Sequence, residues 1–239
     1  MFFYDPLYSL IMLVGLALVF IPQMWVKNTV GRFSEIRTSR GYTGREVAQS
    51  ILSEHGLSNV SIEMADGFLS DHYDPTAKAV RLSPDVYSGN SITSVAVAAH
   101  ECGHAIQHAK GYYPVVIRSS MVPMVNLGSN LGPLLIMGAL GLGAFSHAMP
   151  ALAWNIAWAG VILYGLAVGF HFVTLPVELD ASGRALKVLE THSYLNRDEM
   201  SGAKKVLTAA AFTYVATALY ALMQLMYFVF RLMGSRRDD

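Results

Sequence analysis

Three residues near the middle of the chain have the types and the spacing of a catalytic zinc site. His100, Glu101 and His104 lie in the run HECGH, which follows the pattern His-Glu-x-x-His. On a helix, residues four positions apart lie on one face, one turn apart, so both imidazoles can bind the same ion. The carboxylate of Glu101 can then hold a water molecule and accept its proton, as in metalloproteases. We therefore expect His100 and His104 to be zinc ligands and Glu101 to be the catalytic base.

A further histidine, His108, continues the four-residue spacing but lies too far along the helix to be a third ligand. A helix rises about 1.5 Å per residue, which separates His100 and His108 by about 12 Å along the axis. Zinc–nitrogen bonds are only about 2.0–2.1 Å long. We expect His108 to be a polar residue at the end of the helix. Cys102 should point away from the metal face and serve as a small packing residue.

The composition is typical of a membrane protein. Hydrophobic residues make up 53% of the 239 residues and charged residues only 14%, whereas soluble domains contain about 25% charged residues. The mean hydropathy is +0.39. The formal net charge is zero, so a nucleic-acid partner is not expected, and the single cysteine excludes an intrachain disulfide and a cysteine-rich zinc site. Four stretches without charged side chains are long enough to cross a bilayer, which needs about 20 apolar residues: 7–26, 121–146, 148–177 and 206–230.

The basic residues predict the orientation of these four stretches. Nine Lys and Arg residues lie between Lys27 and Arg118, five lie between Arg184 and Lys205, and three follow the fourth stretch. With four crossings, the segments that contain nine and five basic residues fall on the same side of the bilayer. Because basic loops are retained inside, this side is predicted to be cytoplasmic.

Two local features are expected along the second and third stretches. Pro123 and Pro133 predict a kink or a break in the second helix. The run SHAMP, at residues 146–150, predicts a short turn that joins the second and third helices in a hairpin.

The polar segment from residue 27 to residue 112 predicts a small folded domain. Thr43 and Glu46 have the spacing of a capping box at the start of a helix. Ser91 can cap a second helix, residues 92–109, which carries the two histidines.

Strands are expected between these two helices. The runs VSIEM (60–64) and AKAVRLS (77–83) predict strands, and DHYDP (71–75) predicts a turn. We expect the strand at 77–83 to lie at the edge of the sheet, where it would pair with an extended peptide substrate.

A catalytic zinc ion needs a third protein ligand and one open position. Glu178 and Asp180 follow the third apolar stretch and lie on the same predicted side of the membrane as HECGH. Either carboxylate could complete the site.

Three runs, DHYDP, VAAHECGHAIQHA and LPVELDAS, together resemble the bacterial neutral zinc metallopeptidase family of YugP-like membrane proteins over nearly the whole chain. The layout is more distantly similar to the HtpX and CAAX-prenyl membrane peptidases, gluzincins whose third ligand is the glutamate of an E-x-x-x-D motif. The resemblance implies that Glu178 is the third ligand. The aspartate position of that motif is Ser182 here, and Asp180 is the candidate for the residue that orients a ligand histidine.

A peptidase also needs a donor that stabilises the oxyanion of the transition state. Four residues are candidates for this role, and the sequence does not choose among them: His72, Tyr73, His171 and Arg184.

Together these features predict a mainly α protein, a four-helix transmembrane protein with a small α+β zincin-like cytoplasmic domain. The expected divisions are an N-terminal transmembrane anchor at 1–26, the zincin-like domain at 27–112, and three transmembrane helices at 113–239. Within the last division, the cytoplasmic segment 178–205 supplies the third ligand.

The expected function is that of a zinc-dependent endopeptidase of the bacterial plasma membrane. It would bind one Zn²⁺ per chain and cut peptides or membrane proteins near the cytoplasmic surface, with the lipid bilayer as its other partner. One alternative is a non-catalytic scaffold or chaperone that binds zinc structurally, which has no need of Glu101. Another is a site-2-type intramembrane protease, which uses an aspartate like Asp180, although residues 91–99 before the motif are too short and polar to span a bilayer.

Overall fold

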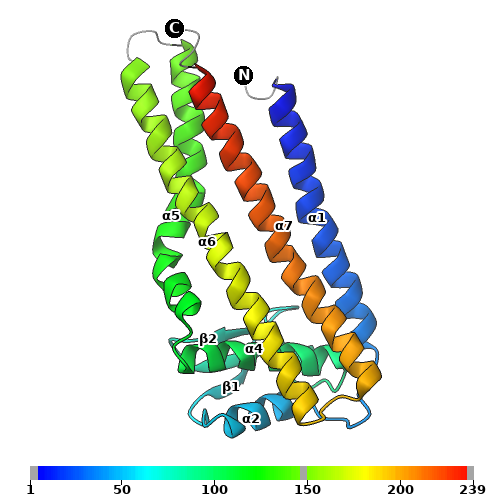
Figure 1. Cartoon of the computed structure of the whole chain (residues 1–239). Helices are drawn as coiled ribbons and strands as arrows, with labels where there is room; N and C mark the ends of the chain where they lie inside the picture. Colours follow the sequence, from blue (N-terminus) through cyan, green and yellow to red (C-terminus); the bar gives the residue numbers. More distant parts are fainter. Residues whose placement is uncertain (1–4, 146–149, 236–239) are drawn as a thin grey trace. The chain divides into compact units, whose positions relative to one another are not determined.

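The computed structural model describes residues 5–145 and 150–235, and these residues are mainly helical (Figure 1). The elements in chain order are α1 (Pro6–Ser34), α2 (Gly44–Glu54), β1 (Ser61–Met64), β2 (His72–Asp74), β3 (Ala79–Leu82), α3 (Pro84–Tyr87), α4 (Ile92–Ala109), α5 (Tyr113–Phe145), α6 (Pro150–Thr191) and α7 (Arg197–Ser235). The chain divides into two compact units. We call Met1–Ile21, Ile117–Thr174 and Tyr214–Asp239 the helical unit, and Pro22–Val116 with Leu175–Thr213 the mixed unit.

The helical unit is built from parts of α1, α5, α6 and α7, the four helices that are long and apolar enough to cross a membrane. Its buried core includes Ile136, Tyr164 and Phe228. Small residues bring α5 and α6 close together, because a Cβ added to Gly160 would lie 2.7 Å from the carbonyl oxygen of Gly132. The prediction of a mainly α protein with four candidate membrane helices is confirmed at this level.

Two predictions concern the second and third apolar stretches. The second stretch was predicted to have a kink or a break, and the break is wrong, because α5 continues through Pro123 and Pro133 as one helix. A proline within a helix removes one backbone hydrogen bond but leaves the bonds on either side of it. The turn predicted at SHAMP falls on residues 146–149, which lie outside the described residues.

The mixed unit contains a three-stranded sheet in the order β1-β3-β2. β1 pairs with β3 in parallel, with Ile62 opposite Val80, and β2 pairs with β3 antiparallel, with Tyr73 also opposite Val80. The central position of β3 contradicts the expectation that this strand is a free edge for substrate. Both sides of its backbone are already paired within the protein.

The expected turn at DHYDP is also wrong in part, because His72–Asp74 is the strand β2. The turn comes after it, where the Asp74 carboxylate accepts hydrogen bonds from the backbone N–H groups of Thr76 and Ala77. A three-residue strand is too short to show the alternation of side chains by which strands are recognised in a sequence.

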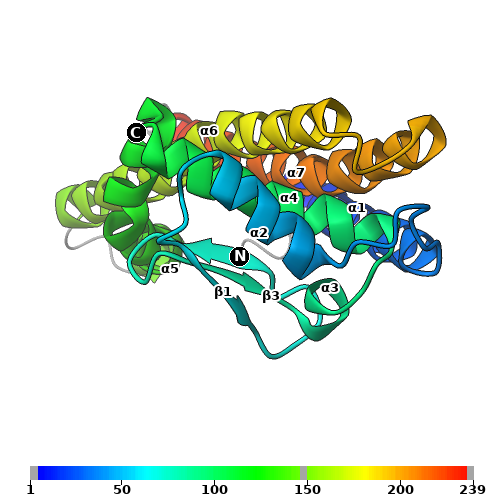
Figure 2. The same cartoon turned by 90° about the horizontal axis from the view of Figure 1, so that it is seen from below.

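The two predicted helices of the mixed unit are confirmed, and they pack against each other (Figure 2). At the start of α2, Thr43 and Glu46 form the capping box, and Ser91 caps α4 with its side chain. Helix α4 also contacts β2 and β3 and is buried along most of its length. Cys102 lies in this core with its thiol 3.7 Å from the carbonyl oxygen of Ala48, as expected for a packing residue.

Candidate metal centre

Helix α4 approaches α6 closely at Gly103, within the mixed unit. A Cβ added to Gly103 would lie 2.7 Å from the carbonyl oxygen of Ala181, so only glycine fits without a shift of the backbone. His100 and His104 lie on either side of Gly103 along α4, and Glu178 lies one turn before Ala181 on α6. The close approach therefore brings candidate ligands from two distant parts of the chain together.

His100, His104 and Glu178 form a cluster whose potential ligand atoms all lie within 4.8 Å of one another. The Nε2 atoms of the two histidines are 3.4 and 3.5 Å from the Oε2 atom of Glu178. Ligand atoms about 2.1 Å from a tetrahedral zinc ion are about 3.4 Å apart, whereas direct N–H···O bonds are about 2.7–3.2 Å long. The spacing thus fits three ligands around one zinc ion better than two direct hydrogen bonds.

The outer ring nitrogens of both histidines also have partners. His104 Nδ1 is 3.0 Å from Oε1 of Gln107, and the amide nitrogen of Gln107 donates to the carbonyl oxygen of Val177 at 2.8 Å and to Asp180 at 2.7 Å. His100 Nδ1 is 3.2 Å from the hydroxyl oxygen of Ser182. Such partners fix the orientation of a ligand ring and are a regular part of zinc sites.

Asp180 is held from its other side by Arg184. The guanidinium of Arg184 donates from Nε to Oδ2 of Asp180 at 2.6 Å and from Nη2 to Oδ1 at 3.3 Å. Its carbon Cζ lies 5.8 Å from the centre of the Tyr112 ring. The fork of two hydrogen bonds fixes the plane of the Asp180 carboxylate.

Comparison with known proteins identifies the family of the chain. A family model described as "Putative neutral zinc metallopeptidase" matches residues 8–233. The chain belongs to this family. It is 40% identical over 233 residues to a protein of Bacillus subtilis (strain 168) described as "Putative membrane protease YugP". The aligned region covers 98% of this chain and 100% of the relative. No solved structure matches the chain. The resemblance seen in the sequence is confirmed.

In this member of the family, Glu101 is buried, with 7% of its surface exposed. Within the described part of the chain, its carboxylate accepts no hydrogen bond and forms no ion pair. It follows His100 directly on α4. A carboxylate next to a candidate ligand and without a hydrogen-bond donor of its own is available to accept a proton from water.

Burial and charge have opposite effects on the neighbouring ionisable groups. Burial lowers the pKa of His104, but the Glu178 carboxylate and the charge of Glu101 outweigh burial and leave this pKa raised. Burial, and to a lesser degree the charge of Glu101, raises the pKa of the Cys102 thiol. A thiol that stays protonated is a poor metal ligand, which agrees with the position of Cys102 outside the cluster.

Among the described residues, the cluster contains His100, His104 and Glu178 and none of the other candidates. His108 is exposed and packs near Tyr73, with 5.9 Å between the ring centres. His72 is exposed, and its Nδ1 lies 2.7 Å from the backbone carbonyl oxygen of Ser70. Arg184 is connected to His104 through Asp180 and Gln107, and His171 belongs to the helical unit.

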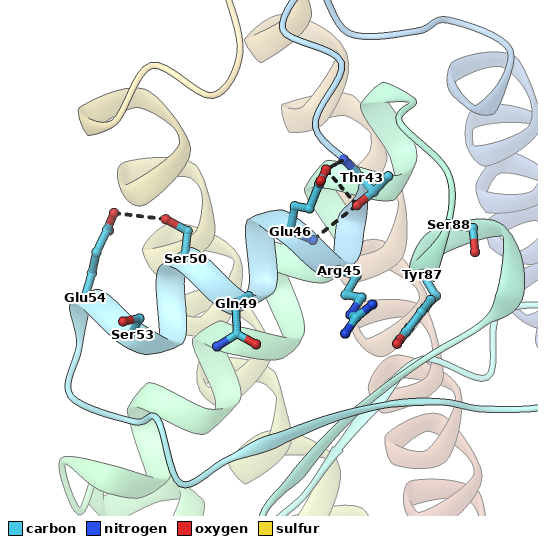
Figure 3. A pocket seen from close by; sticks show the side chains of 9 residues that line it. All are labelled: Thr43, Arg45, Glu46, Gln49, Ser50, Ser53, Glu54, Tyr87 and Ser88. Atoms are coloured by element: carbon cyan, nitrogen blue, oxygen red, sulfur yellow. Dashed lines mark hydrogen bonds between the residues drawn. The ribbon is translucent and has the colours of Figure 1, made fainter.

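A large open hollow of about 760 Å³ lies elsewhere in the mixed unit, along α2 (Figure 3). Its lining includes the capping box and Arg45, whose guanidinium lies 5.3 Å from the centre of the Tyr87 ring. No residue of the His–His–Glu cluster lines this hollow. The metal centre is therefore a separate feature between α4 and α6.

Gly103 and Gln107 were not predicted from the sequence to belong to the site, and Ser182 was recognised only as the residue at the aspartate position of the E-x-x-x-D motif. Gln107 carries a signal, because it is a polar residue three positions after His104 and thus on the same side of the helix. Ser182 lies four positions after Glu178 and thus on the same face of α6. Their contacts depend on how α4 crosses α6, which no local pattern gives.

Proposed function

We propose that this protein is a zinc-dependent endopeptidase that binds one Zn²⁺ per chain through His100, His104 and Glu178, with Glu101 as the catalytic base. The observation that carries this proposal is the spacing of the candidate ligand atoms. Nε2 of His100 and Nε2 of His104 lie 3.4 and 3.5 Å from Oε2 of Glu178, beside Glu101, whose carboxylate has no hydrogen-bond partner among the described residues. The ligand set of two histidines from a His-Glu-x-x-His run and one glutamate from a later helix is that of a gluzincin.

Zinc bound at this cluster would polarise the scissile carbonyl and make an attacking water more acidic. The chain's own groups provide the remaining steps. Glu101 takes one proton from the water as the oxygen of this water attacks the carbonyl carbon. When the carbon–nitrogen bond breaks, Glu101 gives this proton to the leaving amine. His104, held through Gln107, and His100, held through Ser182, stay fixed throughout.

The substrate is a peptide bond in a peptide or a membrane protein close to the membrane surface. Helix α6 supports this location, because it is both a candidate membrane helix and the source of Glu178. The excess of basic residues in the segments that contain the site favours the cytoplasmic side of a bacterial plasma membrane. In this proposal residues 27–112 and 178–205 form the cytoplasmic catalytic part.

Two alternatives fit the geometry less well. A zinc-stabilised scaffold or chaperone has no use for Glu101, a buried carboxylate without a hydrogen-bond donor among the described residues. An intramembrane protease would need the metal-binding helices to cross the bilayer. Helix α4 is not among the four helices found apolar and long enough to do so in the described ranges.

The proposal is tested by measuring zinc content and peptide cleavage for wild type, Glu101→Gln and Glu178→Ala in detergent. We expect Glu101→Gln to keep one zinc per chain and to lose cleavage by about 10²–10⁴-fold. Glu178→Ala should lose both zinc and cleavage. Glu190→Ala is the matched control, because this exposed glutamate lies three turns further along α6, and it should behave as wild type. Equal cleavage by wild type and Glu101→Gln would overturn the peptidase proposal.

A further inference from the structure

Gln107 is a fully buried polar side chain whose hydrogen bonds connect α4 to α6. It is 0% exposed and lies one turn after His104. Its amide nitrogen faces two acceptors, the carbonyl oxygen of Val177 and the carboxylate of Asp180. A buried side chain of this kind is costly unless all its polar atoms are bonded, and here each of them has a partner.

These contacts decide which way the amide of Gln107 points. The NH₂ group must face Val177 and Asp180, because neither of these oxygens can donate a hydrogen. The oxygen Oε1 must then face Nδ1 of His104, 3.0 Å away. Since Oε1 can only accept, Nδ1 of His104 must carry the hydrogen.

The protonation of Nδ1 has a direct consequence for the other ring nitrogen. When the ring is neutral, only one nitrogen carries hydrogen, so Nε2 of His104 then presents its lone pair toward the cluster. This is the form of histidine that binds a metal through Nε2. Without Gln107, the ring could place its hydrogen on Nε2 and donate it to Glu178, which would occupy the ligand position.

We propose that Gln107 is a positioning residue that holds His104 in the form with hydrogen on Nδ1, and that Asp180, fixed by Arg184, holds Gln107. This inference rests on the proposed function for the identity of the metal site, but not for peptide cleavage. His100 is held differently, because the hydroxyl of Ser182 can donate or accept and does not impose one form on the ring. The ring form of His104 is thus fixed by its hydrogen bond to Gln107, whereas His100 can carry its hydrogen on either nitrogen.

The test compares wild type with Gln107→Met, which keeps the length of the side chain and removes its hydrogen bonds. Thr93→Val is the matched control, because Thr93 is also buried on α4 and donates one hydrogen bond, to the carbonyl oxygen of Val30. Zinc affinity is measured by competition with a chromophoric chelator. The hydrogen position on His104 is read from ¹⁵N NMR of histidine-labelled, metal-free protein at alkaline pH, with His104→Gln to assign the signals.

We expect Gln107→Met to lower zinc affinity by about 10–100-fold and to give a mixture of the two neutral forms of His104. Wild type and Thr93→Val should both show hydrogen on Nδ1 and bind zinc equally. If Gln107→Met does not fold, Asp180→Ala serves instead, because the Asp180 side chain is 29% exposed and tolerates truncation. Its loss of affinity should be smaller, since the Val177 carbonyl still holds Gln107.

The positioning role is overturned if Gln107→Met keeps both the affinity and the Nδ1–H form of wild type. In that case a loss of zinc in Glu178→Ala would leave the proposed metal site standing. If wild type binds no zinc, the proposed function fails, while the NMR measurement on metal-free protein still decides the role of Gln107.

Discussion

Gly103 on α4 and Ala181 on α6 mark a contact between two backbones. A Cβ built on Gly103 would lie 2.7 Å from the carbonyl oxygen of Ala181 and 3.2 Å from its Cα. No flexible side chain is involved, so neither helix can yield without moving its neighbours. Because the candidate ligands lie within one turn of these two residues, the contact sets the distance between the histidines and Glu178.

The first prediction follows from this contact. Gly103→Ala should lower the free energy of unfolding by about 1–3 kcal/mol through overpacking, reduced by up to about 1 kcal/mol from the better helix propensity of alanine. Zinc affinity should fall as well, because α6 must move away from the histidines. The measurements are the midpoint of thermal unfolding in detergent and a zinc competition titration.

Gly183→Ala is the control for this substitution. Gly183 is also helical and lies close to the site in sequence, but a Cβ there would meet nothing within 4 Å. This variant should keep its zinc affinity and gain slightly in stability. If the two alanine variants behave alike, the close approach at Gly103 does not set the geometry of the site.

A second prediction concerns the turn between β2 and β3. The hydrogen bond from the backbone N–H of Ala77, together with the ion pair to Arg81, lowers the pKa of Asp74. A carboxyl with a lowered pKa stabilises the fold above its unfolded pKa of about 4, and this contribution is lost as the pH falls further. The thermal midpoint of wild type should therefore fall between neutral pH and about pH 3 by more than that of Asp74→Asn. If the thermal midpoints of wild type and Asp74→Asn fall equally over this pH range, the Asp74 carboxylate does not stabilise the fold.

The sequence was sufficient where structure depends on neighbours along the chain. The helix at 92–109 and its cap at Ser91 were predicted because a cap and a buried helical face are local patterns. The same holds for the capping box of α2 and for the four long apolar stretches. Their existence follows from composition and spacing alone.

The sequence was insufficient where structure depends on pairing between distant segments. The parallel pairing of β1 with β3 requires a crossover that contains β2, and nothing in three residues reveals this order. The connection from His104 through Gln107 to Asp180 likewise depends on how α4 crosses α6. Asp180 was expected to orient a ligand histidine, and the structure shows that its hydrogen-bonded connection to His104 passes through the side-chain amide of Gln107.

A third prediction separates the supports of the two histidines. Ser182→Ala removes the hydroxyl 3.2 Å from Nδ1 of His100. Because this hydroxyl does not impose one ring form, the loss of zinc affinity should be less than the loss in Gln107→Met, and below about tenfold. The measurement is the same zinc competition titration for both variants. A larger loss in Ser182→Ala than in Gln107→Met would contradict the inference that the ring form of His104 is fixed and that of His100 is not.

A fourth prediction is that removal of zinc weakens the fold of the mixed unit. A ligand that binds only the native state stabilises it by about 2.7 kcal/mol when its free concentration is 100 times the dissociation constant. A strong chelator should therefore lower the thermal midpoint of wild type, and added Zn²⁺ should restore it. Mg²⁺ should not, because it prefers oxygen ligands to imidazole. Glu178→Ala, which lacks the proposed third ligand, should unfold at the same temperature with and without chelator. If the chelator lowers the thermal midpoint of this variant as much as that of wild type, the stabilising metal is bound elsewhere in the protein.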